Sequence, residues 1–109
     1  MVTVTNSTYV DEIERAETPV LMTCWAPSCK ACLALKPTME EIAKDRDIKI
    51  ASLNVMESPL LAQRFGIMSL PTTLIMKKGS VIDRMVGAYS KAFIERKLGL
   101  VLARGRREP

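Results

Sequence analysis

The sequence predicts a single α/β domain with a partly parallel sheet and helices on both faces of that sheet. The chain has 109 residues, of which 48% are hydrophobic and 26% charged, which is enough for one hydrophobic core and too little for two domains. Helix-like and strand-like segments alternate over residues 7–66, and a hairpin pattern and a last helix follow. This order is typical of a strand-helix-strand unit, here over residues 20–55, whose crossover is right-handed.

The first expected element is a helix that is capped by Ser7 and ends before Pro19. Acidic residues at positions 11 and 12 suit the positive N-terminal end of a helix. The apolar side of this helix consists of Tyr9, Val10, Ile13 and Ala16.

A short apolar run over residues 20–25 predicts a strand that is buried on both faces and leads into a turn at residues 26–28. From Cys29 onwards the apolar period becomes that of a helix. The predicted apolar stripe of this helix consists of Ala31, Leu35, Met39 and Ile42. Pro37 lies inside it and has no backbone N–H, so we expect a local bend there.

A second strand is expected over residues 48–55, with Ile48, Ile50 and Leu53 pointing inward. A short helix should follow, because Ser58 before Pro59 forms a cap and first turn, and Gly66 is a stop signal.

Residues 72–76 and 80–86 predict a β-hairpin whose turn is Lys77, Lys78 and Gly79. Ser90 is the expected cap of the last helix, whose apolar face consists of Phe93, Ile94, Leu98, Val101 and Leu102. Gly99 destabilises a helix by about 1 kcal/mol relative to Ala, so we expect fraying beyond Leu98.

Charge divides the chain into a neutral body and a basic end. The net charge of +4 comes entirely from residues 91–109, because residues 1–90 contain ten acidic and ten basic side chains. We therefore assign residues 1–103 to the domain and expect residues 104–109 to form a basic, flexible C-terminal tail.

Several classes of function are excluded by composition. The chain has no histidine, which rules out Ser-His-Asp and Cys-His catalysis and zinc sites that use histidine. One Trp, two Tyr and two Phe are too few for base stacking, so we expect no nucleic-acid partner. There is no run of 18 apolar residues and no signal-like N-terminal segment, which predicts a cytoplasmic protein without a membrane partner.

The three cysteines, Cys24, Cys29 and Cys32, carry the chemistry that the sequence offers. A bridge between Cys29 and Cys32 would close a loop worth only about 2 kcal/mol, so a structural staple is a weak interpretation. Cys29 begins a helix, where unpaired N–H groups stabilise a thiolate, and Cys32 lies one turn later. The first sulfur can attack a target disulfide, and the second can then release the reduced target.

Two other interpretations of the cysteines compete with this one. Their spacing matches the first three positions of a plant-type iron-sulfur motif, but a fourth ligand would have to come from a second protomer or an exogenous thiol. Alternatively, all three are small buried hydrophobes, which is the favoured interpretation for Cys24 inside its apolar strand. We expect no metal and no cofactor.

Three segments resemble the thioredoxin family, and the resemblance covers nearly the whole chain. Trp25 and Ala26, followed after two residues by Cys29, Lys30, Ala31 and Cys32 and then by Pro37, are similar to its active-site signature. Residues 65–72 resemble its cis-proline segment, and residues 86–91 the glycine-bearing end of its last strand. The resemblance implies a thioredoxin fold, with a central five-stranded mixed β-sheet flanked by four helices. It also implies a protein disulfide oxidoreductase that serves electron transport and cell redox homeostasis.

The resemblance also implies roles for individual residues. Cys29 would be the nucleophile and Cys32 the resolving thiol, while Pro71 would expose the backbone of Leu70 to an extended substrate chain. Gly87 would allow the substrate to approach, or would only permit a tight strand end. Trp25 would cover the active-site loop or belong to the core. The implied partners are disulfide-bearing or dithiol proteins and a disulfide reductase such as a thioredoxin reductase. We expect the protein itself to be a monomer.

The chain departs from the family at several positions. Lys30 and Ala31 replace the usual Gly and Pro, and Lys30 should favour the Cys29 thiolate and make the disulfide more oxidising. Thr23 replaces a buried aspartate and Ser52 its lysine partner, which predicts slow resolution by Cys32 because a hydroxyl is a poor base. Together with Ser28 in place of a second Trp, these departures motivate an alternative, namely a thioredoxin-fold binding or assembly module without redox turnover.

Overall fold

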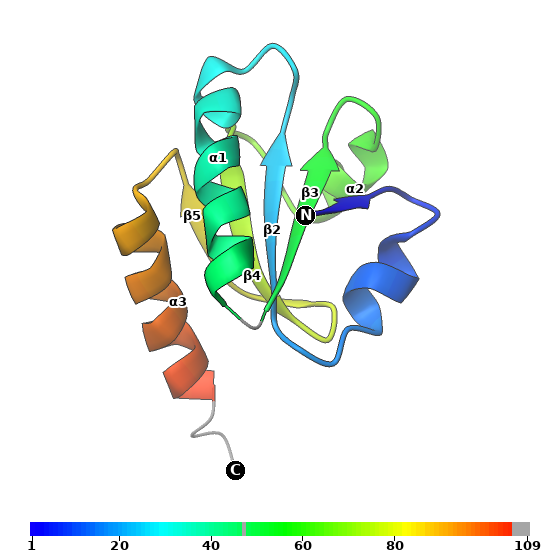
Figure 1. Ribbon diagram of the computed structural model, residues 1–109. Coiled ribbons are helices and arrows are strands. Elements are labelled where there is room, and N and C mark those ends of the chain that lie inside the picture. Colours follow the sequence, from blue (N-terminus) through cyan, green and yellow to red (C-terminus); the bar gives the residue numbers. More distant parts are fainter. Residues whose placement is uncertain (47, 106–109) are drawn as a thin grey trace.

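The computed structural model describes residues 1–46 and 48–105, and these form a five-stranded mixed sheet and four helices (Figure 1). The strands are β1 (Val2–Val4), β2 (Val20–Trp25), β3 (Lys49–Asn54), β4 (Thr72–Lys77) and β5 (Ser80–Val86). The helices are η1 (Val10–Glu14), α1 (Lys30–Asp45), α2 (Pro59–Arg64) and α3 (Lys91–Gly105). The architecture expected from the sequence is therefore confirmed.

The strand order is β1-β3-β2-β4-β5. The first three strands of this order run parallel, and β4 is antiparallel to both β2 and β5. The central strand β2 is thus paired along both edges, and its C-terminal end leads into α1. This end of the sheet carries the cysteines.

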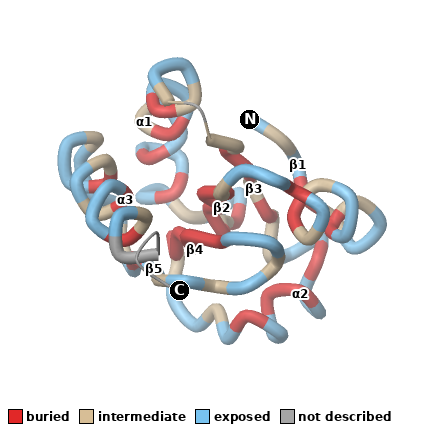
Figure 2. Tube along the Cα trace, turned by 90° about the horizontal axis from the view of Figure 1, so that it is seen from below, coloured by how far each residue is buried: buried red, intermediate tan, exposed pale blue. Residues whose placement is uncertain are grey.

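The core has two halves, one on each face of the sheet. On one face, Tyr9 and Ile13 of the first helical segment and Leu61 and Phe65 near α2 pack against the sheet. On the other face, α1 and α3 contribute Leu35, Met39, Ile42, Ile94, Leu98 and Val101. Figure 2 shows the buried positions gathered on the central strands and on the inward sides of the helices. Strand β2 alternates between the two halves, which is why the whole run from Val20 to Cys24 is buried.

The N-terminal segment differs from the expectation. Residues Val2–Val4 form a strand that pairs with Ala51–Leu53 of β3, where the sequence pattern indicated none. The following helix is a single turn with π-type hydrogen bonding, closed by a bond from Arg15 N–H to the Val10 carbonyl. This wider turn exposes Val10, so its predicted place on the apolar side is wrong. Ser7 is not the cap, because the N-cap position is Tyr9, and the Ser7 hydroxyl lies 3.0 Å from that of Thr5 instead.

Helix α1 buries Cys32, Leu35, Met39 and Ile42. The predicted stripe is correct except at its first position, where Ala31 is exposed and Cys32 takes its place. The spacing of three, four and three residues keeps this stripe on one face of the helix. Pro37 lies on the exposed side, and the helix continues past it to Asp45.

Most local stop and turn signals are confirmed. Gly66 has a φ of +64° and ends the segment that begins with Pro59 at the first turn of α2. Ser58 occupies the N-cap position of that helix, but its side chain forms no capping hydrogen bond. Lys78 and Gly79 both have positive φ and form the tight turn between β4 and β5.

Helix α3 begins as predicted and ends later than predicted. The hydroxyl of Ser90 accepts a hydrogen bond from the N–H of Phe93 at 3.2 Å, which confirms the cap. The helix continues past Gly99 to Gly105 because Val101 is buried against the sheet, so the expected fraying beyond Leu98 is wrong. Of the tail expected at residues 104–109, the last four residues lie outside the described part of the chain. No helix among the described residues is long and apolar enough to span a membrane.

Candidate active site

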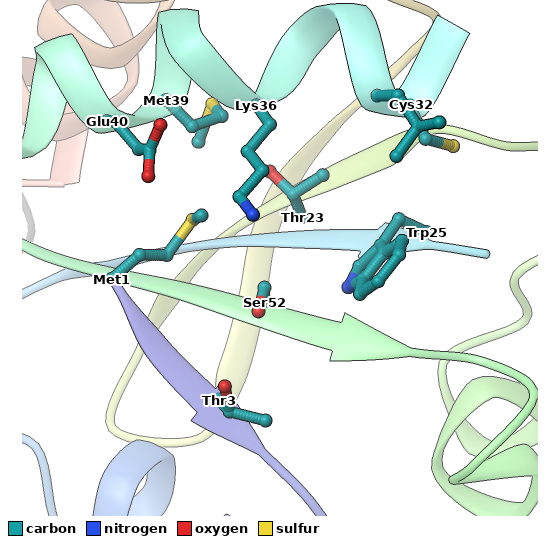
Figure 3. A pocket seen from close by; sticks show the side chains of 10 residues that line it. Met1, Thr3, Thr23, Trp25, Cys32, Lys36, Met39, Glu40 and Ser52 are labelled. Carbon is teal, nitrogen blue, oxygen red and sulfur yellow. The ribbon is translucent and has the colours of Figure 1, made fainter. Parts of the chain in front are cut away.

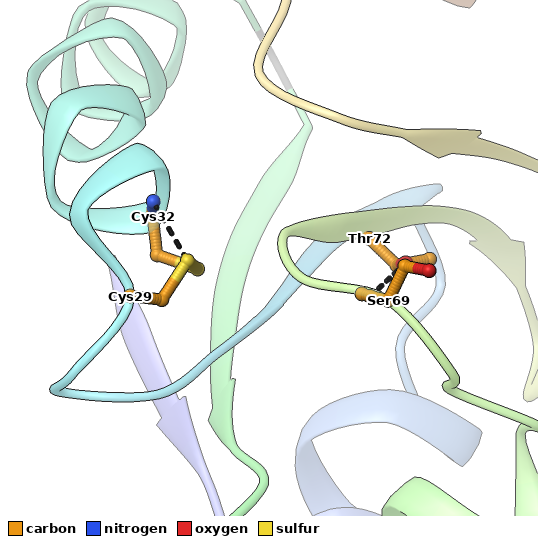
Figure 4. Close-up of a disulfide and its surroundings, with 4 residues drawn as sticks. All are labelled: Cys29, Cys32, Ser69 and Thr72. Carbon is orange, nitrogen blue, oxygen red and sulfur yellow. Dashed lines mark hydrogen bonds between the residues drawn. A yellow bond between two sulfur atoms is a disulfide. The ribbon is translucent and has the colours of Figure 1, made fainter.

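Cys29 and Cys32 lie where β2 passes into α1. The strand ends at Trp25, and a tight turn follows in which the N–H of Cys29 donates to the carbonyl of Ala26 at 3.0 Å. Cys29 is then the N-cap residue of α1, and Cys32 lies in its first turn. The two residues form a disulfide, with their Cα atoms 5.2 Å apart (Figure 4).

The two sulfurs have different surroundings. The backbone N–H of Cys32 donates a hydrogen bond to Sγ of Cys29 at 3.2 Å, so this sulfur takes the place of a capping oxygen. Cys29 is half-buried, whereas Cys32 is 4% exposed. A helix N-terminus favours negative charge because its N–H groups are unpaired and its dipole is positive there. After reduction, the arrangement therefore offers one accessible sulfur suited to a thiolate and one sheltered thiol beside it.

Cys24 takes no part in this site. It is fully buried in the core half that packs against η1 and α2, away from α1. Burial raises the pKa of its thiol to about 12, although the positive charge of Arg84 opposes the shift. In the described part of the chain, no group of three or more Cys, Asp or Glu side chains is arranged to hold a metal ion. The buried position of Cys24 favours its interpretation as a core residue.

The predicted substrate-facing residues are brought together at the start of β4. The Leu70–Pro71 peptide bond is cis. The N–H of Gly87 donates to the carbonyl of Pro71 at 2.8 Å, which ties the end of β5 to this segment. The hydroxyl of Thr72 donates to the Ser69 carbonyl at 2.6 Å (Figure 4), and Thr72 pairs with Cys24 of β2. This register places Pro71 beside the end of β2, from which the active-site turn departs.

Gly87 has a φ of +119°, a backbone conformation in which a residue with a side chain would be strained, so the backbone requires glycine here. A Cβ at this position would meet only ordinary contacts with the ring of Tyr89, the closest at 3.6 Å. Leu70 is half-buried and lies outside the β4 ladder, which begins at Thr72.

A pocket of about 330 Å³ adjoins Cys32 (Figure 3). Its floor includes the buried residues Thr23, Cys32 and Met39. The remaining lining consists of Met1, Thr3, Trp25, Leu33, Lys36, Glu40 and Ser52. Half-buried Trp25 stands beside Cys32 in this wall, and it belongs to neither half of the core.

Hydroxyl side chains form a row across the sheet at the level of this pocket. Thr3, Ser52, Thr23 and Thr73 are consecutive partners in the pairing of β1, β3, β2 and β4. The hydroxyls of Thr23 and Thr73 lie 3.3 Å apart, and Thr23 is only 6% exposed. The two positions at which the sequence departs from an expected charged pair, Thr23 and Ser52, are thus neighbours, and both line the pocket beside Cys32.

Lys30 and Ala31, between the two cysteines, are both exposed. Sequence reasoning missed Lys36 and Glu40 as members of the pocket. The available signal was their spacing, since Cys32, Lys36 and Glu40 follow one another at intervals of four and so lie along one side of α1.

Comparison with known proteins gives a consistent result. A family model described as "Thioredoxin" matches residues 1–99. A protein named "Thioredoxin" from Chlorobaculum thiosulfatiphilum is 43% identical over 96 residues, which cover 86% of this chain and 89% of that protein. "Thioredoxin 2" from Chlorobaculum tepidum is 44% identical over 96 residues, covering 86% and 88%. "Thioredoxin 1" from Nostoc sp. is 38% identical over 97 residues, covering 87% and 91%.

Proposed function

Since the chain belongs to the thioredoxin family and is a thiol-disulfide oxidoreductase, we propose that Cys29 is its nucleophile and Cys32 its resolving thiol. The observation that carries this assignment is the difference between the two sulfurs. Cys29 is the more accessible, and its Sγ accepts a backbone N–H at the helix terminus, whereas Cys32 is buried behind it.

In the proposed reaction, the Cys29 thiolate attacks one sulfur of a protein disulfide and expels the other sulfur as a thiolate. Cys32 then loses its proton and attacks Sγ of Cys29, which breaks the mixed disulfide and releases the second substrate sulfur. The substrate gains two electrons and two protons, and the enzyme is left with the Cys29–Cys32 disulfide. A dithiol substrate drives the same steps in reverse.

We propose that the substrate chain lies against Trp25, Leu70, Pro71 and Gly87. The backbone of Leu70 is outside the β4 ladder, so its polar groups suit pairing with an extended chain. The bond between Gly87 and Pro71 fixes the two sides of this surface relative to each other. Lys30 and Ala31 would modulate the reaction, Lys30 through its charge beside Cys29 and both through their exposure to the substrate.

The proposed partners are disulfide-bearing or dithiol proteins and a disulfide reductase such as a thioredoxin reductase. We propose a cytoplasmic monomer, in keeping with a reducing compartment that returns the disulfide to the dithiol.

Reduction of insulin by dithiothreitol tests the proposed roles. We expect Cys29→Ser to abolish the acceleration that the wild-type protein gives, and Cys32→Ser to accumulate a mixed disulfide at Cys29 that mass spectrometry detects. Accumulation of the mixed disulfide on Cys32 in the Cys29→Ser variant would reverse the roles. Full biological activity of a variant with serine at both positions would instead favour the binding or assembly module.

A further inference from the structure

The charged side chains that line the pocket beside Cys32 come from α1, and its hydroxyl-bearing strands contribute none. Thr3, Thr23 and Ser52 line its strand side, while Lys36 and Glu40 reach it from the helix above (Figure 3). Buried Thr23 and Cys32 form part of the floor, and exposed Lys36 and Glu40 lie at the mouth. Cys32 therefore lines a polar space that solvent can enter.

Lys36 supplies the cationic side chain that points into this space. Its side chain extends from α1 towards the strands (Figure 3), one helical turn after Cys32 on the same side. Within the described residues Lys36 forms no ion pair, whereas Arg15, Lys49, Arg64, Lys91 and Lys97 each do. Its ammonium group is thus available to an anion that forms in the pocket.

Such an anion forms during the proposed reaction. Cys32 must become a thiolate before it attacks Cys29, and it is 4% exposed, so its negative charge is poorly solvated by bulk water. Thr23 and Ser52 offer hydroxyls, which can donate a hydrogen bond to a thiolate but do not supply a charge.

We propose that Lys36 stabilises the Cys32 thiolate electrostatically, and that the pocket passes the released proton to solvent. This inference rests on the proposed role of Cys32 as the resolving thiol. The Cys32 proton leaves to water entering the pocket, the thiolate attacks Sγ of Cys29, and the departing substrate sulfur takes a proton from solvent. Lys36 keeps its own proton throughout, and its charge acts on Cys32 across the pocket.

Other charged groups near Cys32 set the size of the effect. Glu40, which lines the pocket from α1, opposes it, and Lys30 lies in the first turn of α1. Met1, which precedes β1, also lines the pocket, and a free amino group there would add a positive charge. Strands β2 and β3 contribute Trp25 and hydroxyls to the lining and no charge. Substitution of Lys36 alone removes one of these charges and leaves the others in place, so it isolates the contribution of Lys36.

Single-turnover kinetics with a neutral dipyridyl disulfide tests this inference. The first thiopyridone is released when Cys29 attacks, and the second when Cys32 resolves the mixed disulfide, in a step that does not depend on reagent concentration. We expect Lys36→Met to move the pH midpoint of the second step upward by at least about 0.5, which slows resolution about threefold at pH 7. Lys36→Arg should retain the wild-type midpoint because it retains the charge.

Lys44→Met is the matched control, since Lys44 is an exposed lysine on the same helix outside the pocket, and it should leave both steps unchanged. A second-step midpoint in Lys36→Met equal to that of the wild type would overturn the inference while leaving the roles of the cysteines intact. Absence of a second release in the wild type would instead overturn the proposed function itself.

Discussion

At the scale of single residues, the site depends on the different surroundings of two sulfurs that are only three positions apart. Cys29 caps the helix, and its sulfur accepts a hydrogen bond from the N–H of Cys32, while Cys32 is buried and lines the pocket. The spacing of the cysteines and the change of period at Cys29 predicted this arrangement. The pocket was not predictable in the same way, because its lining comes from β1, β2, β3 and α1. No local sequence pattern specifies how these strands pair with one another or how the helix packs on them.

Thr23 gives the most direct prediction at this scale. A carboxylate at position 23 would lie on the pocket floor beside Cys32 and could accept its proton. We expect Thr23→Asp to accelerate the resolution step by at least about 10-fold, as a positioned general base does. The carboxyl group would be placed in a site that is 6% exposed, so the free energy of unfolding should fall by about 1–3 kcal/mol.

Stopped-flow resolution kinetics and urea unfolding of the same variant test both parts. Thr23→Val is the control, because it removes the hydroxyl and adds no base. An unchanged resolution rate in Thr23→Asp would show that the missing base does not limit turnover. Combining Thr23→Asp with Lys36→Met should give a non-additive effect, since the two side chains share the pocket.

At the scale of elements, the strongest local signals were the reliable ones. The turn at Lys78 and Gly79, the stop at Gly66 and the cap at Ser90 are confirmed because each depends on a residue's own conformational or hydrogen-bonding preference. Strand β1 was missed because three residues give almost no periodicity, and it is held mainly by pairing with β3. The end of α3 was placed too early because packing of Val101 outweighs the low helix propensity of Gly99.

Two glycines provide opposite tests of this reasoning. Gly79 has a φ of +83°, and a Cβ there would lie 3.0 Å from Cγ of Glu14. We expect Gly79→Ala to lower the free energy of unfolding by about 1–2 kcal/mol. Gly99 lies in α3 with nothing within 4 Å of a Cβ, so Gly99→Ala should raise it by about 0.5–1 kcal/mol.

Urea denaturation of the oxidised protein and of both variants measures these changes. Each substitution adds the same methyl group, so each serves as the control for the other. Equal effects of the same sign at the two positions would contradict the assignment of a strained turn at Gly79 and an ordinary helix position at Gly99.

At the scale of the whole molecule, the fold separates the three cysteines. Strand β2 sends Cys24 into one half of the core, while the active-site turn carries Cys29 and Cys32 over the other face, where α1 begins. Alternation along a strand predicts such a separation once both faces are known to be covered. Which helices cover each face follows from the crossovers and the strand order, and these come from long-range packing.

The same architecture joins the end of β2 to the start of β4 and the end of β5. Cys24 pairs with Thr72, and the N–H of Gly87 donates a hydrogen bond to the carbonyl of Pro71. These contacts place three distant segments around the end of the sheet that carries the disulfide. The resemblance to a known family implied these residues, whereas their hydrogen bonds and their exposure required the structure.

The pH dependence of alkylation of the reduced protein, resolved by cysteine through mass spectrometry, tests the central claim most directly. Cys29 is predicted to react with iodoacetamide at pH 6 well before Cys32, with a midpoint below the value of about 8.5 for an ordinary thiol. Cys24 serves as the internal control, because its buried thiol should remain unmodified while the protein is folded. A midpoint for Cys29 at or above that of an ordinary thiol would contradict the account.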